Sequence, residues 1–476
     1  MKLADISLLQ LTKAIEHNFK KNNLEHVLEL ICAKARLLYI YNQKYRDDQS
    51  ETLLNAIADK FKTEFSHRSN DKTVLFYDGF GLDARGLVQQ YLTGLVENNY
   101  KVLYISVSPD ESEQPHVSRI LKRGNGKFLS LQGKNFIDKI VWLRNVCSYH
   151  CFSYAFLYTT PYDVASIVTF SLLKEKAIRY QINLTDQAFW LGAQAFDYCI
   201  EFRNYGAAIT RDYRKVNSEK LVYLPYYPIL NEYEIFQGFP ELIKNKKVIL
   251  SGGATYKTLD NNNTFYNIVE SLLDKYNDVA FMYLSNDTVK QLDSLKKKYP
   301  QRVVHLSERS DLIEVMKHSR LFLNTYPISG GLMVQYAAIS GCIPVTLKRE
   351  WDDDAVGLLK NENVLNEIFT VKSKFIDEIG RLLEDENYFK EKKKMLEGQV
   401  LTPAEFAKGL QKIIINPKET TFTDIKSVDT KMYRQSLAEN LSRNDVIQCL
   451  IRKETPKVCR YFPKLTVEWI IKRLFK

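Results

Sequence analysis

Short apolar runs that alternate with helical stretches constrain the fold of this chain more than any other feature of its sequence. Residues 73–78 (TVLFYD) form a β-rich run that ends in an acidic residue, and residues 101–107 (KVLYISV) form the next run. A Gly-Phe-Gly segment and a helical stretch separate them. Such a β–loop–α–β unit predicts an α/β protein with a parallel sheet. Further strands are expected in the first half of the chain at residues 151–158, 177–184, 198–202, 207–210 and 221–226.

The same alternation begins again after an irregular stretch at residues 227–246. Strands are expected at residues 247–251, 279–285, 302–307, 320–326 and 343–348. Helices are expected at residues 264–276, 288–298, 310–318 and 331–341. Two Rossmann-like domains are the simplest arrangement that explains two such series. Ligands of open parallel sheets bind beyond the carboxyl ends of the strands, so we expect the site in a cleft between two facing domains.

Helical patterns are expected at both ends of the chain. Apolar residues recur at helical spacing up to about residue 65, and two breaks divide this region into three helices. We therefore divide the chain into a helical N-terminal extension (residues 1–68), two Rossmann-like domains (69–230 and 231–420) and a helical, basic C-terminal tail (421–476).

Composition and cysteine usage indicate a cytoplasmic globular protein. Hydrophobic residues make up 45% and charged residues 26% of the chain, near the globular average. The seven cysteines are scattered and odd in number, which is typical of reduced thiols. The N-terminus lacks the apolar core of a signal peptide, and no window approaches the length of a membrane span. We expect no metal ion, because Cys147, His150 and Cys151 lack a second pair of ligands and residues 352–354 (DDD) are interpreted as a loop or helix cap.

Residues 251–257 (SGGATYK) follow the first strand of the second series directly. Their small side chains allow a ligand to approach the backbone closely, and Lys257 can neutralise a phosphate. The spacing is not that of a Walker P-loop. The alternative interpretation is an ordinary βα turn with an exposed lysine.

Residues 324–345 (NTYPISGGLMVQYAAISGCIPV) carry a stronger pattern. A strand ends, Pro327 turns the chain, and the Gly330-Gly331 pair opens a helix that ends at Gly341. The start of such a helix offers unpaired N–H groups and the positive end of the helix dipole, which together suit a diphosphate. The alternative interpretation is that the two glycines only allow tight packing.

Three blocks, taken in order, resemble GT-B glycosyltransferases, in particular the group of O-GlcNAc transferase and the bacterial cytoplasmic protein glucosyltransferases. The blocks are SGGATYK, RVVHLSERSDLIEVMKHSRLFLNTYP and PISGGLMVQYAAISGCIPV, and they cover about residues 247–348. The resemblance implies a GT-B fold with two facing Rossmann-like domains, the first for the acceptor and the second for the nucleotide sugar. It implies a UDP-linked sugar as substrate, and no cofactor. The donor-binding residues that it implies are Gly253, Tyr256, Lys257, Ser307, Tyr326, Ser329, Gly330, Gly331 and Gln335.

The donor loop departs from the pattern of these families at several positions. Tyr336 replaces an acid in the donor helix, Leu332 and Met333 stand where the group has Thr, and Asn324 replaces an Asp. Retaining GT-B families place two glutamates eight residues apart here, and this chain has Ile328 and Tyr336. We therefore expect direct, inverting displacement without a metal ion.

Two segments of the N-terminal half are candidates for the acceptor side. Residues 78–86 (DGFGLDARG) lie at a strand-to-helix junction, and Gly81 and Arg85 are predicted to bind the acceptor. Residues 183–192 (NLTDQAFWLG), followed by residues 202–206 (FRNYG), suggest a sugar-facing platform with a carboxylate, in which Trp190 and Arg203 bind the acceptor.

Transfer needs a base that deprotonates an acceptor hydroxyl. Asp186 is the predicted catalytic base and Asp83 the second catalytic candidate, with Asp78 and His116 as further alternatives. The competing interpretation places Trp190 and its neighbour Phe189 in the core and makes Asp186 a helix cap.

We expect the enzyme to move a sugar from a nucleotide sugar to a hydroxyl of a cell-surface glycan of the capsule, O-antigen or exopolysaccharide type, which is lipid-linked as it grows. One alternative acceptor is a protein side chain of the adhesin type, with the helical N-terminus as its docking module. Another alternative is a non-catalytic GT-B-like subunit that binds a partner. A second copy of the chain is a candidate partner, and nucleic acid is not expected because no recognised module is present.

The last 22 residues concentrate the positive charge. Residues 455–476 (TPKVCRYFPKLTVEWIIKRLFK) contain six Lys or Arg and one Glu, a net charge of +5 out of +10 for the chain. Bulky apolar residues accompany these charges, which is typical of a helix that lies in an anionic membrane interface. This predicts a protein that is peripheral at the inner face of the plasma membrane. The alternative is a C-terminal helix packed across the first domain.

Overall fold

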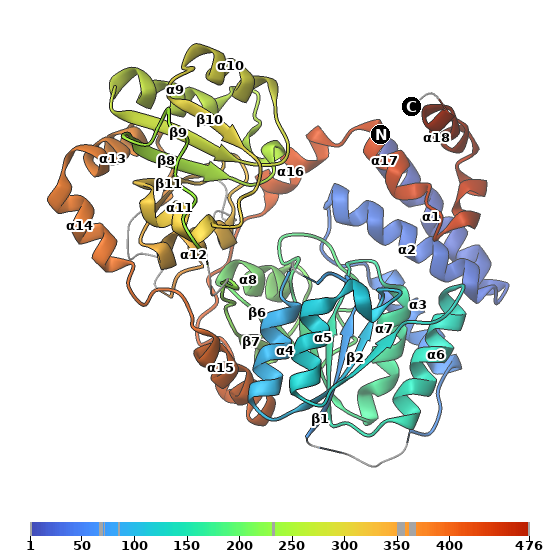
Figure 1. Cartoon of the computed structure of the whole chain (residues 1–476). Helices are drawn as coiled ribbons and strands as arrows, with labels where there is room; N and C mark the ends of the chain where they lie inside the picture. Colours follow the sequence, from blue (N-terminus) through green and yellow to red (C-terminus); the bar gives the residue numbers. More distant parts are fainter. Residues whose placement is uncertain are drawn as a thin grey trace. The chain divides into compact units, whose positions relative to one another are not determined.

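The computed structural model of the chain describes residues 2–65, 70, 72–83, 86–230, 234–349, 358–360 and 368–474. The chain forms two compact units (Figure 1). The first comprises Met1–Pro225 and Pro403–Lys476, and the second comprises Tyr226–Thr402. Each unit contains one parallel sheet covered by helices, as the alternation in the sequence predicts.

The first unit is built on a seven-stranded sheet with the order β3-β2-β1-β4-β5-β6-β7. Every neighbouring pair is parallel. The order reverses between β1 and β4, which is the point where open α/β sheets bind ligands. The strands are β1 (Thr73–Asp78), β2 (Lys101–Ser106), β3 (Lys127–Ser130), β4 (Tyr154–Tyr158), β5 (Ile178–Ile182), β6 (Tyr198–Glu201) and β7 (Leu221–Tyr223).

Alternate residues of the strands pack against two different helical layers. Leu75 and Tyr77 of β1 belong to one large buried cluster together with residues of the N-terminal helices. Phe76, between them, faces the other layer, where its ring lies 6.5 Å from Tyr91. The helices of the first layer are α1 (Leu3–Lys20), α2 (Leu24–Tyr41), α3 (Asp48–Lys60), α6 (Phe136–Tyr149) and α7 (Val164–Leu172). The three predicted N-terminal helices are therefore part of the core of the first unit.

The other layer includes α4 (Val88–Glu97), its neighbour α5 (Pro115–Arg123) and α15 (Pro403–Ile415). The sequence pattern ends the second domain at residue 420, whereas the second unit ends at Thr402. The difference arises because α15 packs on α4. Phe406 is fully buried, and its ring meets Tyr91 edge-on at 5.2 Å.

Two local expectations for the first unit differ from the structure. Residues 207–210, expected as a strand, lie inside α8 (Asn204–Asp212). The expectation was wrong because a run of four residues is too short to distinguish the period of a strand from that of a helix. Strand β3 was not expected, and its residues are only partly buried, so the sequence lacks the apolar run of a central strand. Short 3₁₀ helices of this unit are η1 (Glu111–Glu113), η2 (Leu173–Glu175), η3 (Ser218–Lys220) and η5 (Pro417–Thr420).

The second unit has a six-stranded sheet with the order β10-β9-β8-β11-β12-β13, and its strands are also parallel. Its strands are β8 (Lys247–Gly252), β9 (Val279–Leu284), β10 (Val303–Leu306), β11 (Leu321–Leu323), β12 (Ile343–Leu347) and β13 (Ile368–Phe369). Its helices are α9 (Thr264–Lys275), α10 (Lys290–Lys298), α11 (Leu312–His318), α12 (Gly331–Ser340), α13 (Lys372–Glu384) and α14 (Glu386–Met395). The order reverses between β8 and β11, so this sheet repeats the pattern of the first.

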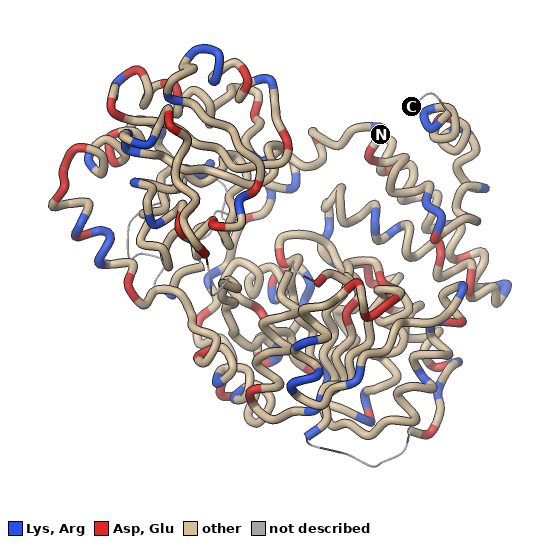
Figure 2. Tube along the Cα trace, viewed as in Figure 1, with Lys and Arg blue, Asp and Glu red and all other residues tan. Residues whose placement is uncertain are grey.

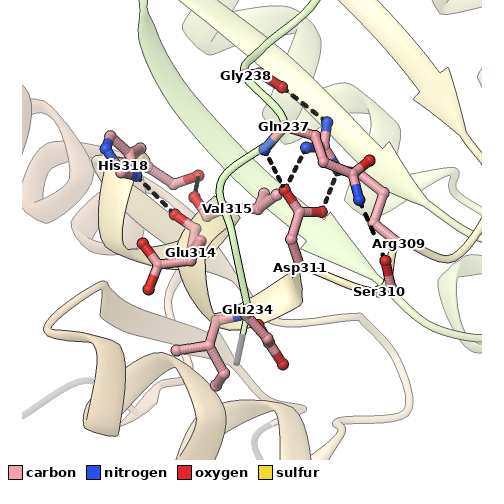
Figure 3. Close-up of polar contacts among 11 residues, drawn as sticks. Glu234, Gln237, Gly238, Arg309, Ser310, Asp311, Glu314, Val315 and His318 are labelled. Carbon is pink, nitrogen blue, oxygen red and sulfur yellow. Dashed lines mark hydrogen bonds and ion pairs between the residues drawn. The ribbon is translucent and has the colours of Figure 1, made fainter. Parts of the chain in front are cut away.

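Part of the irregular stretch between the two series is attached to the second unit (Figure 3). The backbone N–H of Gln237 donates to Asp311 at 2.8 Å, and Arg309 donates to the carbonyl of Gly238 at 2.9 Å. Arg309 also pairs with Asp311 at 2.6 Å. The carboxylate of Glu234 accepts from the N–H of Ile313 at 2.8 Å and so caps α11. Backbone groups of Gln237 and Gly238 and the side chain of Glu234 therefore fix this stretch to the start of α11.

The C-terminal region returns to the N-terminal helices of the first unit. Its elements are α16 (Lys431–Asn440), α17 (Arg443–Leu450), η6 (Pro456–Tyr461) and α18 (Pro463–Leu474). The N–H of Lys457 donates to Glu29 on α2 at 2.9 Å, and Arg36 on α2 donates to Thr455 at 3.2 Å. Among the helices of the described residues, we find none with the length and apolar character needed to span a membrane.

Candidate functional site

Two of the predicted blocks meet where the strand order of the second sheet reverses. Residues 253–257 follow β8, and residues 324–330 follow β11, the neighbouring strand. The N–H of Ile328 donates to the carbonyl of Lys257 at 3.3 Å, so the two loops lie side by side. The carboxyl ends of β8 and β11 therefore bring together the segments that carry Lys257 and the Gly330-Gly331 pair.

Asn324 shapes the loop between β11 and α12. Its side chain is 2% exposed, and its Oδ1 accepts from the N–H groups of Thr325 at 3.0 Å and Gly330 at 2.9 Å. Its Nδ2 donates to Oγ1 of Thr346 at 3.1 Å. An amide can accept and donate at once, whereas an ionised carboxylate only accepts. The Asn found here, where the glycosyltransferases that the sequence resembles have Asp, thus has a defined structural role.

Helix α12 begins without a capping side chain. Gly330 is its N-cap, no acidic residue lies in its first turn, and it is 10 residues long. Its first N–H groups and its dipole are therefore suited to an anionic group. A Cβ on Gly331 would come within 2.9 Å of Leu358, so the glycine permits close packing as well. Gly341 ends the helix in the left-handed conformation, with φ of 66°, at the predicted position.

The loop after β8 combines an open backbone with an exposed ring. Gly253 has φ of 116°, and no atom lies within 4 Å of the position of a Cβ there. The hydroxyl of Tyr283 on β9 donates a hydrogen bond to the carbonyl of Gly253 at 3.0 Å and so holds the loop in place. Residues Thr255–Thr258 form η4, in which Tyr256 is 61% exposed. This geometry lets a ligand reach the backbone and the tyrosine ring.

The other predicted donor-binding residues fall into two groups. Ser307, just after β10, is exposed, while Tyr326 and Ser329 are half-buried in the loop that leads to α12. Gln335 instead is fully buried, and its Nε2 donates to the carbonyls of Tyr226 at 2.8 Å and Leu358 at 3.0 Å. Gln335 therefore packs the second unit and does not point to solvent.

Asp78 organises the turn at the carboxyl end of β1 in the first unit. Its side chain is fully buried, and one oxygen accepts from the N–H groups of Phe80 at 2.8 Å and Gly81 at 3.1 Å. The other oxygen accepts from the hydroxyl of Tyr104 at 2.6 Å. Burial raises the pKa of Asp78, although these hydrogen bonds oppose the change. Gly81, with φ of 63°, is required by this turn, and a buried Asp78 cannot reach an acceptor.

Asp83 and His116 form a pair beside this turn, in which the imidazole is exposed and the carboxylate is largely buried. The carboxylate of Asp83 lies 2.5 Å from Nδ1 of His116 and accepts from the backbone N–H groups of His116 and Val117 at 2.9 and 3.0 Å. Asp83 thus caps the first turn of α5 and orients the imidazole. The side chain of His116 is 48% exposed and that of Asp83 is 12% exposed. Arg85, the neighbouring predicted residue, lies outside the described residues.

Asp186, the predicted base, is part of a buried ion pair. Its side chain is 1% exposed, and its two oxygens accept from Nε and Nη2 of Arg203 at 2.5 and 2.8 Å. Trp190 is also buried, at 3% exposure, with the guanidinium of Arg214 4.5 Å from its ring centre. This geometry favours the packing interpretation of residues 183–192. Asp186, Trp190 and Arg203 have little surface with which to contact an acceptor.

The ion pair belongs to a larger buried network that the sequence reading missed. Glu201, at the end of β6, is fully buried and accepts from Asn183 at 2.9 Å and from Thr210 at 2.6 Å. Arg214 is fully buried as well, and it donates to Thr210 and to the carbonyl of Asp186, each at 3.0 Å. The only signal in the sequence is that Glu201 lies within an apolar run at 198–202 and that Arg214 follows another at 205–209. Periodicity alone does not assign such residues to the interior.

The strand ends opposite to these sites carry two surface hollows. One, of about 520 Å³, is lined by residues that include Asp197, Lys220 and Lys418. The other, of about 640 Å³, is lined by residues that include Phe65 and Lys176. Both adjoin the amino ends of strands, away from the predicted residues. Within the part of the chain that the structure describes, no three His, Cys, Asp or Glu side chains gather as metal ligands would.

Comparison with known proteins identifies the fold. No protein-family model matches the chain, and no curated protein matches it in sequence. Among solved structures, an O-GlcNAc transferase from Thermobaculum terrenum is 13% identical with a TM-score of 0.50, and the match covers 91% of this chain and 82% of that one. A glycosyltransferase from Rickettsia africae (10% identity, TM-score 0.52) and TarM (10%, 0.54) each match over 73% of this chain and 99% of theirs. The chain thus has the GT-B fold of these glycosyltransferases, as the resemblance implied.

Proposed function

We propose that this protein is a glycosyltransferase that moves a sugar from a nucleotide sugar, UDP-linked in the first instance, to a hydroxyl group. One observation carries the proposal. In a chain with a GT-B fold, the uncapped start of α12 lies beside the loop of Lys257, at the point where the strand order of the second sheet reverses. Such a point is where open α/β sheets bind nucleotides, and such a helix start binds phosphate groups.

On the donor side, the protein must stabilise the negative charge that develops on the leaving diphosphate. The bond between the sugar and the diphosphate breaks as the diphosphate leaves with the electron pair, so negative charge develops on its oxygens. The N–H groups of Gly331 and its neighbours, together with the ammonium group of Lys257, stabilise that charge in this mechanism. Gly253 and Tyr256 supply an open backbone and a ring against which the nucleotide can lie.

We assign the general base to His116, oriented by Asp83. The carboxylate holds Nδ1–H of the imidazole, which leaves Nε2 with a lone pair for the proton of the acceptor hydroxyl. The hydroxyl oxygen attacks the anomeric carbon, its proton passes to Nε2, and the configuration is inverted. This assignment replaces Asp186 with one of the alternatives from the sequence. It is supported by the exposure of His116 and by the burial of Asp186 in its pair with Arg203.

For the acceptor we propose a growing, lipid-linked cell-surface glycan, handled by an enzyme that is peripheral at the inner face of the plasma membrane. A protein acceptor would need a docking module, for which the N-terminal helices were the candidate. In the structure α2 is buried along most of its length in the core of the first unit, and it is not a separate module. This supports a glycan acceptor over a protein acceptor.

A non-catalytic subunit is the second candidate, and the side chains around the start of α12 are compatible with it. Ile328 and Tyr336 stand at the positions of the two glutamates of retaining families, and the hydroxyl of Tyr336 donates to the carbonyl of Ile229 at 2.9 Å. Leu332 and Ile328 expose apolar side chains, at 39% and 43%, near the start of α12. An enzyme with inverting chemistry tolerates these residues, but so does a subunit that only binds a partner.

Nucleotide release separates the two candidates. The purified protein is incubated with a panel of UDP-, GDP- and dTDP-sugars, with and without a lipid-linked glycan fraction, and free nucleoside diphosphate is measured. The proposal predicts glycan-dependent release with one donor, and a loss of about 10²–10⁴-fold in His116→Gln. Exposed Lys290→Gln on α10 is the control and keeps the rate. No release with any donor, from a protein that still binds a diphosphate, would assign the chain to the non-catalytic class.

A further inference from the structure

Helix α18 presents an apolar stripe to solvent. Val467, Ile470, Ile471 and Leu474 are 57%, 44%, 49% and 74% exposed. Their spacing of three, four and seven residues places them on one face of the helix. Aliphatic side chains that are exposed singly are normal at a protein surface, whereas four on one helical face are a recognition feature.

The opposite face of α18 attaches the helix to the first unit. Leu465 is 5% exposed within the main buried cluster, and Trp469 packs partly buried against the same cluster. Glu468 pairs with Arg443 on α17 at 2.9 Å. The helix is therefore held in the fold by one side, and this orientation directs the stripe away from the unit to which it belongs.

Lys and Arg recur along the C-terminal segment of the chain (Figure 2). The helical repeat places Lys464 at one edge of the stripe and Arg473 at the other. Between residues 452 and 474 the chain has seven Lys or Arg and two Glu, and one of the two acids, Glu468, also pairs with Lys472 at 3.2 Å. The exposed cations of this region are Arg452, Lys453, Arg460, Lys464, Lys472 and Arg473.

We infer that α18 is an interfacial helix that lays its stripe into an anionic lipid bilayer. Anionic head groups complement the cations at both edges of the stripe, and the acyl region takes up the four aliphatic chains. A symmetric dimer through the same face would bring the cations of two α18 helices together without acids to pair them, which disfavours a second copy. The inference is independent of the glycosyltransferase chemistry, because no residue of α18 takes part in it.

The structure also indicates how to test the stripe without unfolding the protein. Deletion of the tail would remove Val458, Phe462 and Leu465 from the core, so point changes are preferable. The test variant is Val467→Ser/Ile470→Ser/Ile471→Ser, all at exposed positions. The matched control, Ile235→Ser/Leu242→Ser/Ile415→Ser, changes three aliphatic side chains that are 82%, 50% and 68% exposed elsewhere on the chain. Unchanged far-UV circular dichroism and melting temperature verify that both variants fold.

The measurement is flotation of the full chain with vesicles of phosphatidylcholine alone or with a third of phosphatidylglycerol. We expect binding to the anionic vesicles only, a loss of more than about tenfold in the test variant, and no loss in the control. Lys464→Gln/Arg473→Gln weakens binding by about fivefold per charge, and added salt weakens it further.

Three results would overturn the inference. They are no flotation of the full chain, equal flotation of the full chain and the test variant, and equal binding to neutral and anionic vesicles. Light scattering on the same samples identifies the competing occupant. A dimer that the serine changes dissociate, in a protein that does not bind vesicles, would assign the stripe to a second copy.

Discussion

At the scale of single residues, Asp186 shows how burial decides what a carboxylate can do. An acid after a strand, next to an aromatic pair, resembles a catalytic base in the sequence. In the structure its two oxygens are occupied by Arg203, and a Cβ on Gly206 would lie 2.8 Å from its own Cβ. Sequence patterns locate such a residue at a strand end. They do not reveal that it pairs in the fold with a cation 17 positions further along the chain, here Arg203.

Replacement of Asp186 by Asn is therefore expected to act on stability. The change removes the negative charge of Asp186 from its buried pair with the guanidinium of Arg203, and breaking such a pair costs roughly 3–5 kcal/mol of unfolding free energy. Urea unfolding measures this, with Asp59→Asn in the exposed pair with Lys62 as a control of unchanged midpoint. A variant of unaltered stability that has lost nucleotide release would instead restore Asp186 as the base.

Glu51 gives a pH-dependent test of the junction between α3 and the loop after β5. It is 2% exposed and accepts from the N–H groups of Gly192 at 2.8 Å and Ala193 at 3.3 Å. Burial, opposed by these hydrogen bonds, raises the pKa of Glu51 to about 7, against about 4.3 in an unfolded chain. The folded state thus binds the proton more tightly, and the associated stability is full below about pH 4 and is lost as the pH rises to about 7.

The neutral variant Glu51→Gln lacks this titration. The unfolding free energy of the natural protein should therefore fall relative to that of the variant between about pH 4 and pH 7. Urea midpoints of both proteins at several pH values measure the difference. A difference that stays constant with pH would contradict the assignment.

At the scale of elements, α15 shows why boundaries are harder to predict than the elements themselves. Its apolar positions recur at helical spacing, so a buried face can be predicted from the sequence. That face meets α4, more than 300 residues earlier in the chain, where Gly94 gives it room: a Cβ there would lie 3.2 Å from Leu410. The sequence of α15 itself does not reveal that the helix packs on α4. A domain boundary based only on the alternation of strands and helices therefore assigns α15 to the second series.

The attachment of α15 to the first unit predicts a local effect of Phe406→Ala. Loss of a fully buried ring costs roughly 3–5 kcal/mol, and the cost should fall on the first unit. Amide hydrogen exchange should then speed up in β1 and β2 but not in β8 and β9. Phe375→Ala on α13, also fully buried, is the matched control with the reverse pattern. Faster exchange in β8 after Phe406→Ala would contradict the assignment of α15.

At the scale of the whole molecule, two sheets share one strand order up to their sixth strands. The loops that follow the carboxyl ends of parallel strands all lie at the same edge of the sheet. The sequence could therefore predict that the loops of Lys257 and Gly330 lie close together. It could not predict the network of Glu201 and Arg214 or the burial of Gln335, because these depend on contacts between residues that are 28 and 109 positions apart in the chain. The fold and the proximity of these two loops are thus predictable from alternation and motifs, and the buried polar groups are not.

In the proposed function, the second unit holds a nucleoside diphosphate between the loop of Lys257 and the start of α12. Titration calorimetry of the full chain with UDP, GDP and dTDP tests it most directly, with Lys257→Gln as the test variant and Lys290→Gln as its control. We expect one diphosphate to bind at a ratio of one to one, with more than about tenfold weaker binding in Lys257→Gln and unchanged binding in the control. No heat with any diphosphate, or equal affinity of the natural protein and Lys257→Gln, would contradict it.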